Sequence, residues 1–362
     1  MTETKKNENE IKNIAMPLLE WYRKNKRDLP WRRTKDPYAI LVSEMMLQQT
    51  QVNTVIDYYA RFLTRFPDFN ALAYAEEQAV LALWQGLGYY SRARNLHQLA
   101  KQVVQTCGGR LPDDVEALKK LPGIGDYMCG AVMSIAFQKP VPAVDGNVLR
   151  VTTRVLNIHE DITKAKTKHT VTEKVAAWMP KNAASDFTQA MMELGALICK
   201  PKNPDCGICP LKTVCTALAA GTAEALPVKE SKKKPMSQFY YAVLITAEDK
   251  LLMQQRDADG LLAGMWGLPL VEKQAGMDID AVIGERMHTS MPAGKHLGAV
   301  SHVFTHRRWE MTVVHYQLGK ETISPYGTWI DLDELDDVPI PTAFKKVICM
   351  LAFQNREKSE EK

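Results

Sequence analysis

The chain has 362 residues, which is enough for two ordinary domains and more than one small core requires. Hydrophobic residues make up 46% and charged residues 24%, a balance typical of soluble globular proteins, and no apolar run is long enough to span a bilayer. The net charge of +4 is compatible with a polyanionic partner, but many mildly basic enzymes bind no nucleic acid. Residues 1–13 are polar and lack a signal-peptide core, so we expect a cytoplasmic protein that does not bind membranes and that lies in the nucleoid if it meets DNA.

Residues 11 to about 216 show the pattern of helices joined by short turns. Asp36 followed by Pro37 is typical of an N-cap and a first helical turn. Apolar residues at helical spacing then predict one helix over 38–59. Further helices are expected at 113–122, 126–137 and 186–199.

Composition changes after the last of these helices. Small residues and two prolines predict an interdomain linker over 219–237. Aromatic and β-branched residues then predict strands at 240–247, 251–253 and 312–316. A closing helix is expected at 344–353, followed by a charged, disordered tail at 356–362.

A glycine-containing turn joins two of the predicted helices. In Leu121-Pro122-Gly123-Ile124-Gly125 the two glycines permit a tight turn and a close backbone approach. The free N–H groups of the next helix, at the positive end of its dipole, offer a site for a phosphate. The turn is therefore either a helix-hairpin-helix clamp for the DNA backbone or an ordinary connection between two helices.

Four of the seven cysteines lie within seventeen positions, at Cys199, Cys206, Cys209 and Cys215. Disulfides are not expected in a reducing compartment, so the cluster predicts a metal site. Four thiolates can hold a [4Fe–4S] cluster or a zinc ion, and unligated cysteines are a third interpretation. A zinc deaminase would need a His-x-Glu sequence, which does not occur in this chain.

Two carboxylates, Asp145 and Glu44, lie at positions that allow either a structural or a functional role. Asp145 precedes a predicted helix, where an aspartate is commonly just an N-cap, but the glycine turn lies twenty residues upstream. Glu44 lies in the apolar helix 38–59, where it is either a surface residue or a buried acid with a raised pKa.

Together these motifs resemble the MutY family of adenine DNA glycosylases. The matching segments are Pro30-Trp31-Arg32, Ser43–Thr50, Gln85–Tyr90, the hairpin, Asp145-Gly146-Asn147 and the four cysteines. The resemblance implies a two-domain fold. An all-α helix-hairpin-helix glycosylase domain would span 1–218, with its hairpin at about 113–137 and a [4Fe–4S] loop at 199–215. After the linker, an α+β Nudix/MutT-like lesion-recognition domain would span 238–355.

The same resemblance implies a monofunctional glycosylase of base excision repair. It would hydrolyse the N-glycosidic bond of a flipped adenine mispaired with 8-oxoguanine or guanine. Glu44, protonated, would donate to adenine N7, and Asp145 would stay ionised beside an oxocarbenium-like sugar, with or without a covalent adduct. Tyr127 and Asn147 would orient these groups. Bifunctional relatives carry a Schiff-base lysine at the position of Tyr127, so little or no lyase activity is expected.

The resemblance also implies a set of residues that bind double-stranded DNA carrying A:8-oxoG or A:G mispairs. Leu47, Gln49 and Tyr89 would fill the gap and contact the lesion strand. The loop Phe304-Thr305-His306 would read 8-oxoguanine. The remaining members are Arg32, Leu121, Gly123 and Gly125. Asp126 departs from the family, which usually has arginine there, and is expected to weaken local DNA binding. We expect a monomer.

The segment Leu261–Pro269 resembles the entry to a Nudix fold, but residues 270–300 lack the Arg-Glu-x-x-Glu-Glu pattern that holds magnesium. The C-terminal domain is therefore expected to be a reader without hydrolase activity. Two other interpretations stay open. One is a thymine- or damaged-pyrimidine-directed glycosylase or lyase, against which Tyr127 and the MutT-like domain argue. The other is a catalytically silent DNA-binding or redox-sensing protein, against which Glu44 and Asp145 argue.

Overall fold

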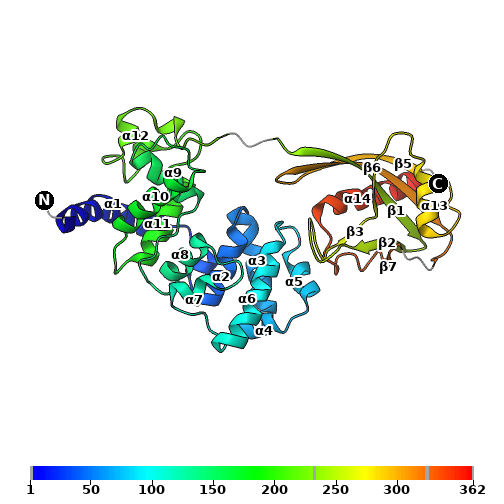
Figure 1. Cartoon of the computed structure of the whole chain (residues 1–362), viewed down its shortest axis with the longest axis horizontal. Coiled ribbons are helices and arrows are strands. Elements are labelled where there is room, and N and C mark those ends of the chain that lie inside the picture. Colours follow the sequence, from blue (N-terminus) through cyan, green and yellow to red (C-terminus); the bar gives the residue numbers. More distant parts are fainter. Residues whose placement is uncertain (1–2, 231–233, 323–325, 361–362) are drawn as a thin grey trace. The chain divides into compact units, whose positions relative to one another are not determined.

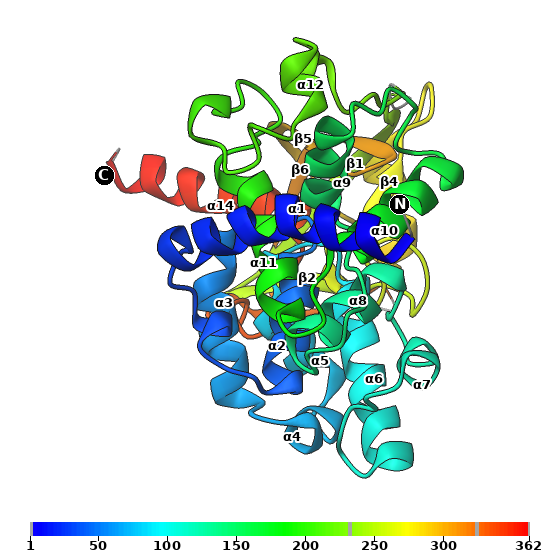
Figure 2. The ribbon, with the colours of Figure 1, turned by 90° about the vertical axis from the view of Figure 1, so that its left-hand side faces the viewer.

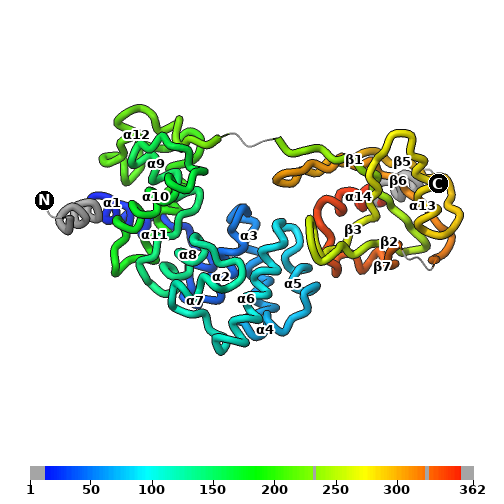
Figure 3. The backbone as a smooth tube through the Cα atoms, viewed as in Figure 1, coloured from blue at the N-terminus to red at the C-terminus, as the bar shows by residue number. Residues whose placement is uncertain are grey.

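The computed structural model describes the backbone of residues 3–230, 234–322 and 326–360 (Figure 1). Side chains are described for the same ranges except 3–12 and 352–360, and Figure 3 colours only the residues for which both are described. Contacts divide the chain into one unit of residues 1–74 and 91–231 and a second of residues 75–90 and 232–362. No helix in the described ranges is long and apolar enough to cross a membrane.

The first unit is helical. Its longer helices are α1 (Glu3–Asn25), α2 (Pro37–Leu47), α3 (Val52–Arg65), α6 (Ser91–Cys107), α8 (Asp126–Ile135), α9 (Gly146–Val155), α10 (Ala165–Trp178) and α11 (Ala184–Leu197). Its short elements are η1 (Pro30–Arg32), α4 (Phe69–Ala73), α7 (Val115–Lys119), η2 (Cys206–Ile208), α12 (Thr216–Ala219) and η3 (Ala223–Ala225). The expected all-α character of this part is therefore confirmed.

One core of this unit forms where α1 packs against α10 and α11, and α11 packs against α9 (Figures 1 and 2). Leu18 and Tyr22 from α1 meet Trp178 from α10 and Phe187 from α11, all of them buried. Burial of such large side chains stabilises a fold by roughly 2–3 kcal/mol each. This packing fixes α9 and α11, the two helices on which part of the candidate site stands.

The prediction of one helix over 38–59 is wrong. Asp36 does cap α2, because its carboxylate accepts the N–H groups of Tyr38 and Ala39. The helix ends at Leu47, however, and α3 starts at Val52. Between them Gln49 has φ = 57°, and the guanidinium of Arg92 donates to the carbonyls of Met45, Met46 and Gln48. A cation that holds the last free carbonyls ends a helix, and the distant Arg92 gave no local sequence signal.

The second unit contains a mixed sheet with the strand order β3-β2-β1-β6-β5. Its strands are β1 (Met236–Ala247), β2 (Lys250–Gln255), β3 (Trp266–Gly267), β4 (Leu270–Glu272), β5 (Lys295–Val303), β6 (Arg307–Leu318) and β7 (Thr328–Asp331). The long strands β1 and β6 pair in parallel, from Met236 opposite Arg307 to Ala247 opposite Leu318. β4 pairs with β1, and β7 with β2.

A helix covers each face of this sheet because alternate strand residues point to opposite sides. Ala242 and Leu244 pack toward Phe344 of α14 (Thr342–Glu360). Val243 and Ile245 pack toward Ile283 of α13 (Ile279–Met287). The expected α+β architecture of the C-terminal part is therefore confirmed.

Three boundaries differ from those expected. The segment Ala75–Tyr90, which contains α5 (Glu77–Trp84), groups with the C-terminal unit instead of the helical one. β1 begins at Met236, within the expected linker. The tail expected to be disordered continues α14 to Glu360, since Arg, Lys and Glu are good helix formers; residues 361 and 362 lie outside the described ranges.

Candidate active site

Glu44 is a buried acid in the middle of α2. It is 5% exposed and lies among residues of α2 that are also buried, from Tyr38 to Met46. The phenol of Tyr127, from α8, donates to Oε2 of Glu44 over 2.5 Å. Burial raises the pKa of Glu44 to about 7; the Tyr127 hydrogen bond opposes this rise, the charge of Asp145 adds to it, and that of Arg32 opposes it.

Asp145 is the N-cap of α9, and its carboxylate is fixed at both oxygens. Oδ1 accepts the N–H of Val148 at 2.7 Å, and Oδ2 accepts the side-chain amide of Asn147 at 2.8 Å. Burial raises the pKa of Asp145, while these hydrogen bonds lower it. The capping and functional interpretations are therefore compatible, because capping holds the carboxylate in one orientation.

The structure brings the four expected catalytic residues to one pocket. Its lining includes Glu44, Tyr127, Asp145 and Asn147. These residues come from α2, α8 and the start of α9, so segments a hundred positions apart in sequence meet here. A buried proton donor and a fixed carboxylate facing one cavity can act on opposite ends of a single bond.

Close packing of two helices places Asn147 in this pocket. A Cβ on Gly195 of α11 would lie 2.5 Å from Cβ of Asn147, so only glycine lets α9 approach this closely. Arg150 then donates to Oδ1 of Asn147 at 2.8 Å and to the carbonyls of Gly195 at 2.8 Å and Cys199 at 2.7 Å. One arginine thus connects the cysteine loop to the residue that orients Asp145.

Arg32, which the sequence analysis expects to contact DNA, lies in the wall of the same pocket. Its Nη1 and Nη2 donate to Oε1 and Oε2 of Glu193 at 2.9 and 2.8 Å. The side chain is largely buried. Glu193, on α11, gave no signal in the sequence because nothing local predicts its partners.

A cleft adjoins the pocket and shares Leu47, Tyr127, Asp145 and Asn147 with it. Gln49, exposed and in a left-handed conformation, also lines the cleft. Two further lining residues, Lys168 and Thr172, were missed by sequence analysis. Their spacing of four places them on one face of α10, and this spacing was the available signal.

The glycine turn connects α7 to α8 as expected. Gly123 has φ = +76°, and Gly125 is the N-cap of α8, with open space around its Cα. Leu121 is buried, so any DNA contact it makes has to come from its backbone. Asp126 pairs with Nζ of Lys119 at 2.7 Å, which offsets its negative charge beside the start of α8.

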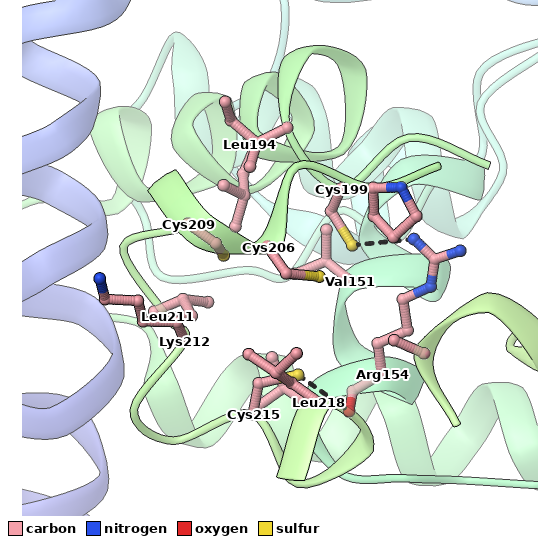
Figure 4. A pocket seen from close by; sticks show the side chains of 14 residues that line it. Val151, Arg154, Leu194, Cys199, Cys206, Cys209, Leu211, Lys212, Cys215 and Leu218 are labelled. Carbon is pink, nitrogen blue, oxygen red and sulfur yellow. Dashed lines mark hydrogen bonds between the residues drawn. The ribbon is translucent and has the colours of Figure 1, made fainter. Parts of the chain in front are cut away.

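The four clustered cysteines surround one cavity (Figure 4). Val151, Leu194, Leu211 and Leu218 supply apolar walls, and Arg154 donates from Nη1 to Sγ of Cys199 at 3.3 Å. All four are free thiols. Among the described residues no three His, Cys, Asp or Glu side chains are arranged to hold a single metal ion. The donor set is uniform sulfur in an apolar cavity.

In the second unit, two expected DNA-binding residues meet. The hydroxyl of Tyr89 lies 3.1 Å from Oγ1 of Thr305, and both side chains are exposed. Phe304 packs edge-on against His302 and Trp309, which anchors the loop between β5 and β6. His306 is exposed. The segment 75–90 and this loop therefore present their polar groups together.

Comparisons with known proteins agree with this architecture. Residues 42–177 match the HhH-GPD superfamily of base excision DNA repair proteins, and residues 240–350 match the NUDIX domain. A solved thermostable thymine-DNA glycosylase is 29% identical with a TM-score of 0.54, covering 59% of this chain and 98% of its own. Fold and site thus define a helix-hairpin-helix base excision repair protein with a NUDIX-type second domain.

The relatives narrow this class to one family. The adenine DNA glycosylase of Rattus norvegicus is 36% identical over 394 residues, covering 91% of this chain and 76% of that protein. That of Homo sapiens is 35% identical over 404 residues, covering 93% and 74%. The chain belongs to the adenine DNA glycosylase family.

Proposed function

We propose that this protein excises adenine mispaired with 8-oxoguanine or guanine in double-stranded DNA, as a monofunctional N-glycosylase of base excision repair. The observation that carries the proposal is the pairing of Glu44 and Asp145 in one pocket, with Tyr127 bonded to Glu44. Adenine has to leave the base stack before these groups can reach it, and unstacking costs a few kcal/mol.

Glu44 acts as the general acid. With a pKa of about 7, it holds its proton in a large fraction of molecules near neutral pH, whereas an ordinary glutamate would not. Donating that proton to N7 makes adenine a better leaving group, an effect of roughly 10²–10⁴ in rate. Tyr127 fixes the carboxyl group through its 2.5 Å hydrogen bond.

Asp145 stabilises the sugar as it becomes positively charged. The amide of Asn147 and the N–H of Val148 hold its carboxylate before the reaction begins, so little reorganisation is needed. Opposite charges ~4 Å apart at an effective dielectric near 20 gain about 4 kcal/mol, or roughly three orders of magnitude in rate. Acid catalysis and positioning supply the rest. Tyr127 cannot form a Schiff base, so strand cleavage is not part of the activity.

The four cysteines hold a [4Fe–4S] cluster in this proposal. Four thiolates around an apolar cavity match its ligand requirement, and the Arg154 donor to Cys199 suits a sulfur that carries negative charge. When bound, the cluster ties together the loop between α11 and α12 and supplies a redox-active centre. Arg150 transmits the position of that loop to Asn147 through its bond to the Cys199 carbonyl.

DNA is held at two places in the first unit and read in the second. The N–H groups at the start of α8, beside Gly125, bind one phosphate, and Lys168 binds another along the cleft. Leu47 and Gln49 occupy the space the adenine leaves. Tyr89 and Thr305, with Phe304 and His306, contact the 8-oxoguanine strand.

The test is a panel of duplexes carrying a single A:8-oxoG, A:G, T:G or oxidised-pyrimidine site, incubated with the protein and then treated with alkali. We expect breakage at A:8-oxoG and A:G only after alkali, because an abasic site is the product. Breakage at T:G would assign the thymine activity instead, and breakage without alkali would make the protein a lyase. Binding without any breakage would leave a DNA-binding protein.

A further inference from the structure

Glu193 lies in the wall of the pocket that contains Glu44, and it is only 1% exposed. Two arginines donate to it. Arg27 contributes its backbone N–H at 3.0 Å, Nε at 2.9 Å and Nη2 at 2.7 Å. Arg32 contributes Nη1 at 2.9 Å and Nη2 at 2.8 Å. Both guanidinium groups therefore meet the carboxylate in a two-point geometry, the strongest form of this ion pair.

The two arginines favour the ionised form of Glu193. Burial alone would raise its pKa, but the hydrogen bonds from Arg27 and Arg32 lower the pKa to about 2. The three side chains consequently carry two positive charges and one negative charge. Glu193 cancels one of the two positive charges in this wall of the pocket.

Arg32 is the member of this trio that acts on Glu44. Both line the pocket, and the charge of Arg32 lowers the pKa of Glu44, against the effect of burial. A neighbouring cation favours the ionised form of an acid, and Glu44 is useful as an acid only while protonated. An arginine in this position therefore works against the proton on Glu44 unless something offsets its charge.

The other elements packed against α2 also carry titratable or charged groups. Tyr127 of α8 bonds to Glu44, and Asp145 at the start of α9 favours its protonated form. The remaining titratable or charged groups buried on α3, α6 and α8 are Tyr59, Arg92, His97 and Cys129. Burial raises the pKa of Tyr59 to about 12, which keeps it neutral. Arg92 is held by the carbonyls at the end of α2.

We propose that Glu193 is a positioning residue that offsets the charge of Arg32 and so keeps Glu44 in its acid form. This inference rests on the proposed function for the catalytic meaning of that proton. The effect of Glu193 on the proton of Glu44 can be measured whether or not the protein excises adenine. Removal of Glu193 leaves two uncompensated guanidinium groups beside the pocket, and removal of Arg32 leaves Glu193 still paired with Arg27. The two changes therefore act on the Glu44 proton in opposite directions.

The experiment measures the titration midpoint of the Glu44 carboxyl group by NMR in protein labelled with ¹³C at glutamate carboxyl carbons. Glu44→Gln identifies the resonance by its disappearance. We expect Arg32→Gln to raise the midpoint and Glu193→Gln to lower it, each by about half a pH unit or more. If Glu193→Gln does not fold, because unpaired buried arginines destabilise it, Arg32→Gln still tests the premise that the charge of Arg32 opposes the proton on Glu44.

Arg33→Gln is the matched control. Arg33 neighbours Arg32 in sequence, carries the same charge, and is exposed and paired with Asp28 outside the pocket. Its removal should leave the Glu44 midpoint unchanged. A midpoint that Arg32→Gln leaves unmoved or lowers would overturn the inference, as would equal shifts in Arg32→Gln and Arg33→Gln.

A second measurement links the effect to catalysis. In single-turnover excision from an A:8-oxoG duplex, the pH at which the rate falls should move up in Arg32→Gln and down in Glu193→Gln. A glutamate that only stabilises the fold or only contacts adenine would change the rate without moving this pH. If the wild-type protein excises no adenine, the proposed function fails while the NMR midpoints still test the role of Glu193.

Discussion

The hydroxyl of Tyr127 lies 2.5 Å from Oε2 of Glu44, so a phenol from α8 holds the acid of α2 in a single orientation. The Tyr127→Phe variant keeps the ring and removes this bond. Because the bond lowers the pKa of Glu44, its loss should raise that pKa, and a less well oriented acid should react roughly 10- to 100-fold more slowly. Single-turnover rates across pH 5–9 measure both effects. An unchanged rate and pH profile would show that Tyr127 plays no part in orienting the acid.

Burial of Glu44 carries a cost in stability that a Glu44→Gln variant should remove. The folded-state pKa of about 7 lies above the ordinary value of 4.5, so the folded state binds this proton more tightly. Stability is therefore unaffected below about pH 4.5 and falls as pH rises toward 7, by about 3 kcal/mol in total. Urea unfolding at pH 8 should show the variant to be more stable than wild type, with the advantage much reduced at pH 5.

The exposed Glu116→Gln is the control for this comparison, since Glu116 lies on the surface of α7. It should show the same stability relative to wild type at both pH values. A Glu44→Gln protein that is less stable than wild type at pH 8 would contradict the buried, proton-holding state of Glu44.

Substitution of the two hairpin glycines should have two different effects, one on stability and one on DNA binding. Gly123 has φ = +76°, and a Cβ there would lie 2.9 Å from Cβ of Asn95 and 3.1 Å from Cε of Met45. Gly123→Ala should therefore destabilise the protein by about 1–3 kcal/mol. Gly125 has no heavy atom within 4 Å of such a Cβ and an ordinary φ of −89°. Gly125→Ala should fold normally but bind DNA more weakly, because its methyl group stands before the free N–H groups of α8.

Unfolding curves and duplex binding for both variants check this division. If Gly125→Ala bound DNA as tightly as wild type, the start of α8 would lose its role as a phosphate site.

The sequence motifs predicted the catalytic residues of the site more completely than the residues that form and support its walls. Glu44, Asp145, Tyr127 and Asn147 were found because each belongs to a local pattern of the family, and the structure places them in one pocket. The arginine partners of Glu193 lie more than 160 positions away, and Arg150 connects the nearby Asn147 to carbonyls more than forty positions away, so no local pattern reveals these contacts. Arg32 was assigned to DNA from its family motif, and its pairing with Glu193 is visible only after α11 has packed.

In the fold, too, features set by local sequence were predicted and features set by distant contacts were not. Asp36 predicted the start of α2 because capping is local. Arg92, which ends α2, comes from a helix that begins more than forty residues later, so the pattern over 38–59 predicted one helix instead of two. The segment Ala75–Tyr90 groups with the C-terminal unit through contacts such as Gln78 Nε2 to the carbonyl of Gly264 at 3.0 Å, which sequence order cannot indicate.

Lys168 should contribute one phosphate contact to DNA binding. It lines the cleft beside Asp145, whereas Lys166, two positions earlier on α10 and also exposed, does not. Each phosphate contact to duplex DNA adds about 0.9 to the slope of log K against log salt concentration. Lys168→Gln should reduce that slope by about one, and Lys166→Gln should change it little. Equal slopes for the two variants would place the DNA backbone away from α10.

The pH dependence of single-turnover adenine excision, at saturating protein on an A:8-oxoG duplex, tests the central claim most directly. The reaction requires Glu44 protonated and Asp145 ionised, so the rate should fall about tenfold per pH unit above the Glu44 pKa of about 7 and fall again in acid as Asp145 takes up a proton. The alkaline fall should be absent from the residual rate of Glu44→Gln. A wild-type rate that stays level or increases from pH 7 to 9 would contradict acid catalysis by Glu44.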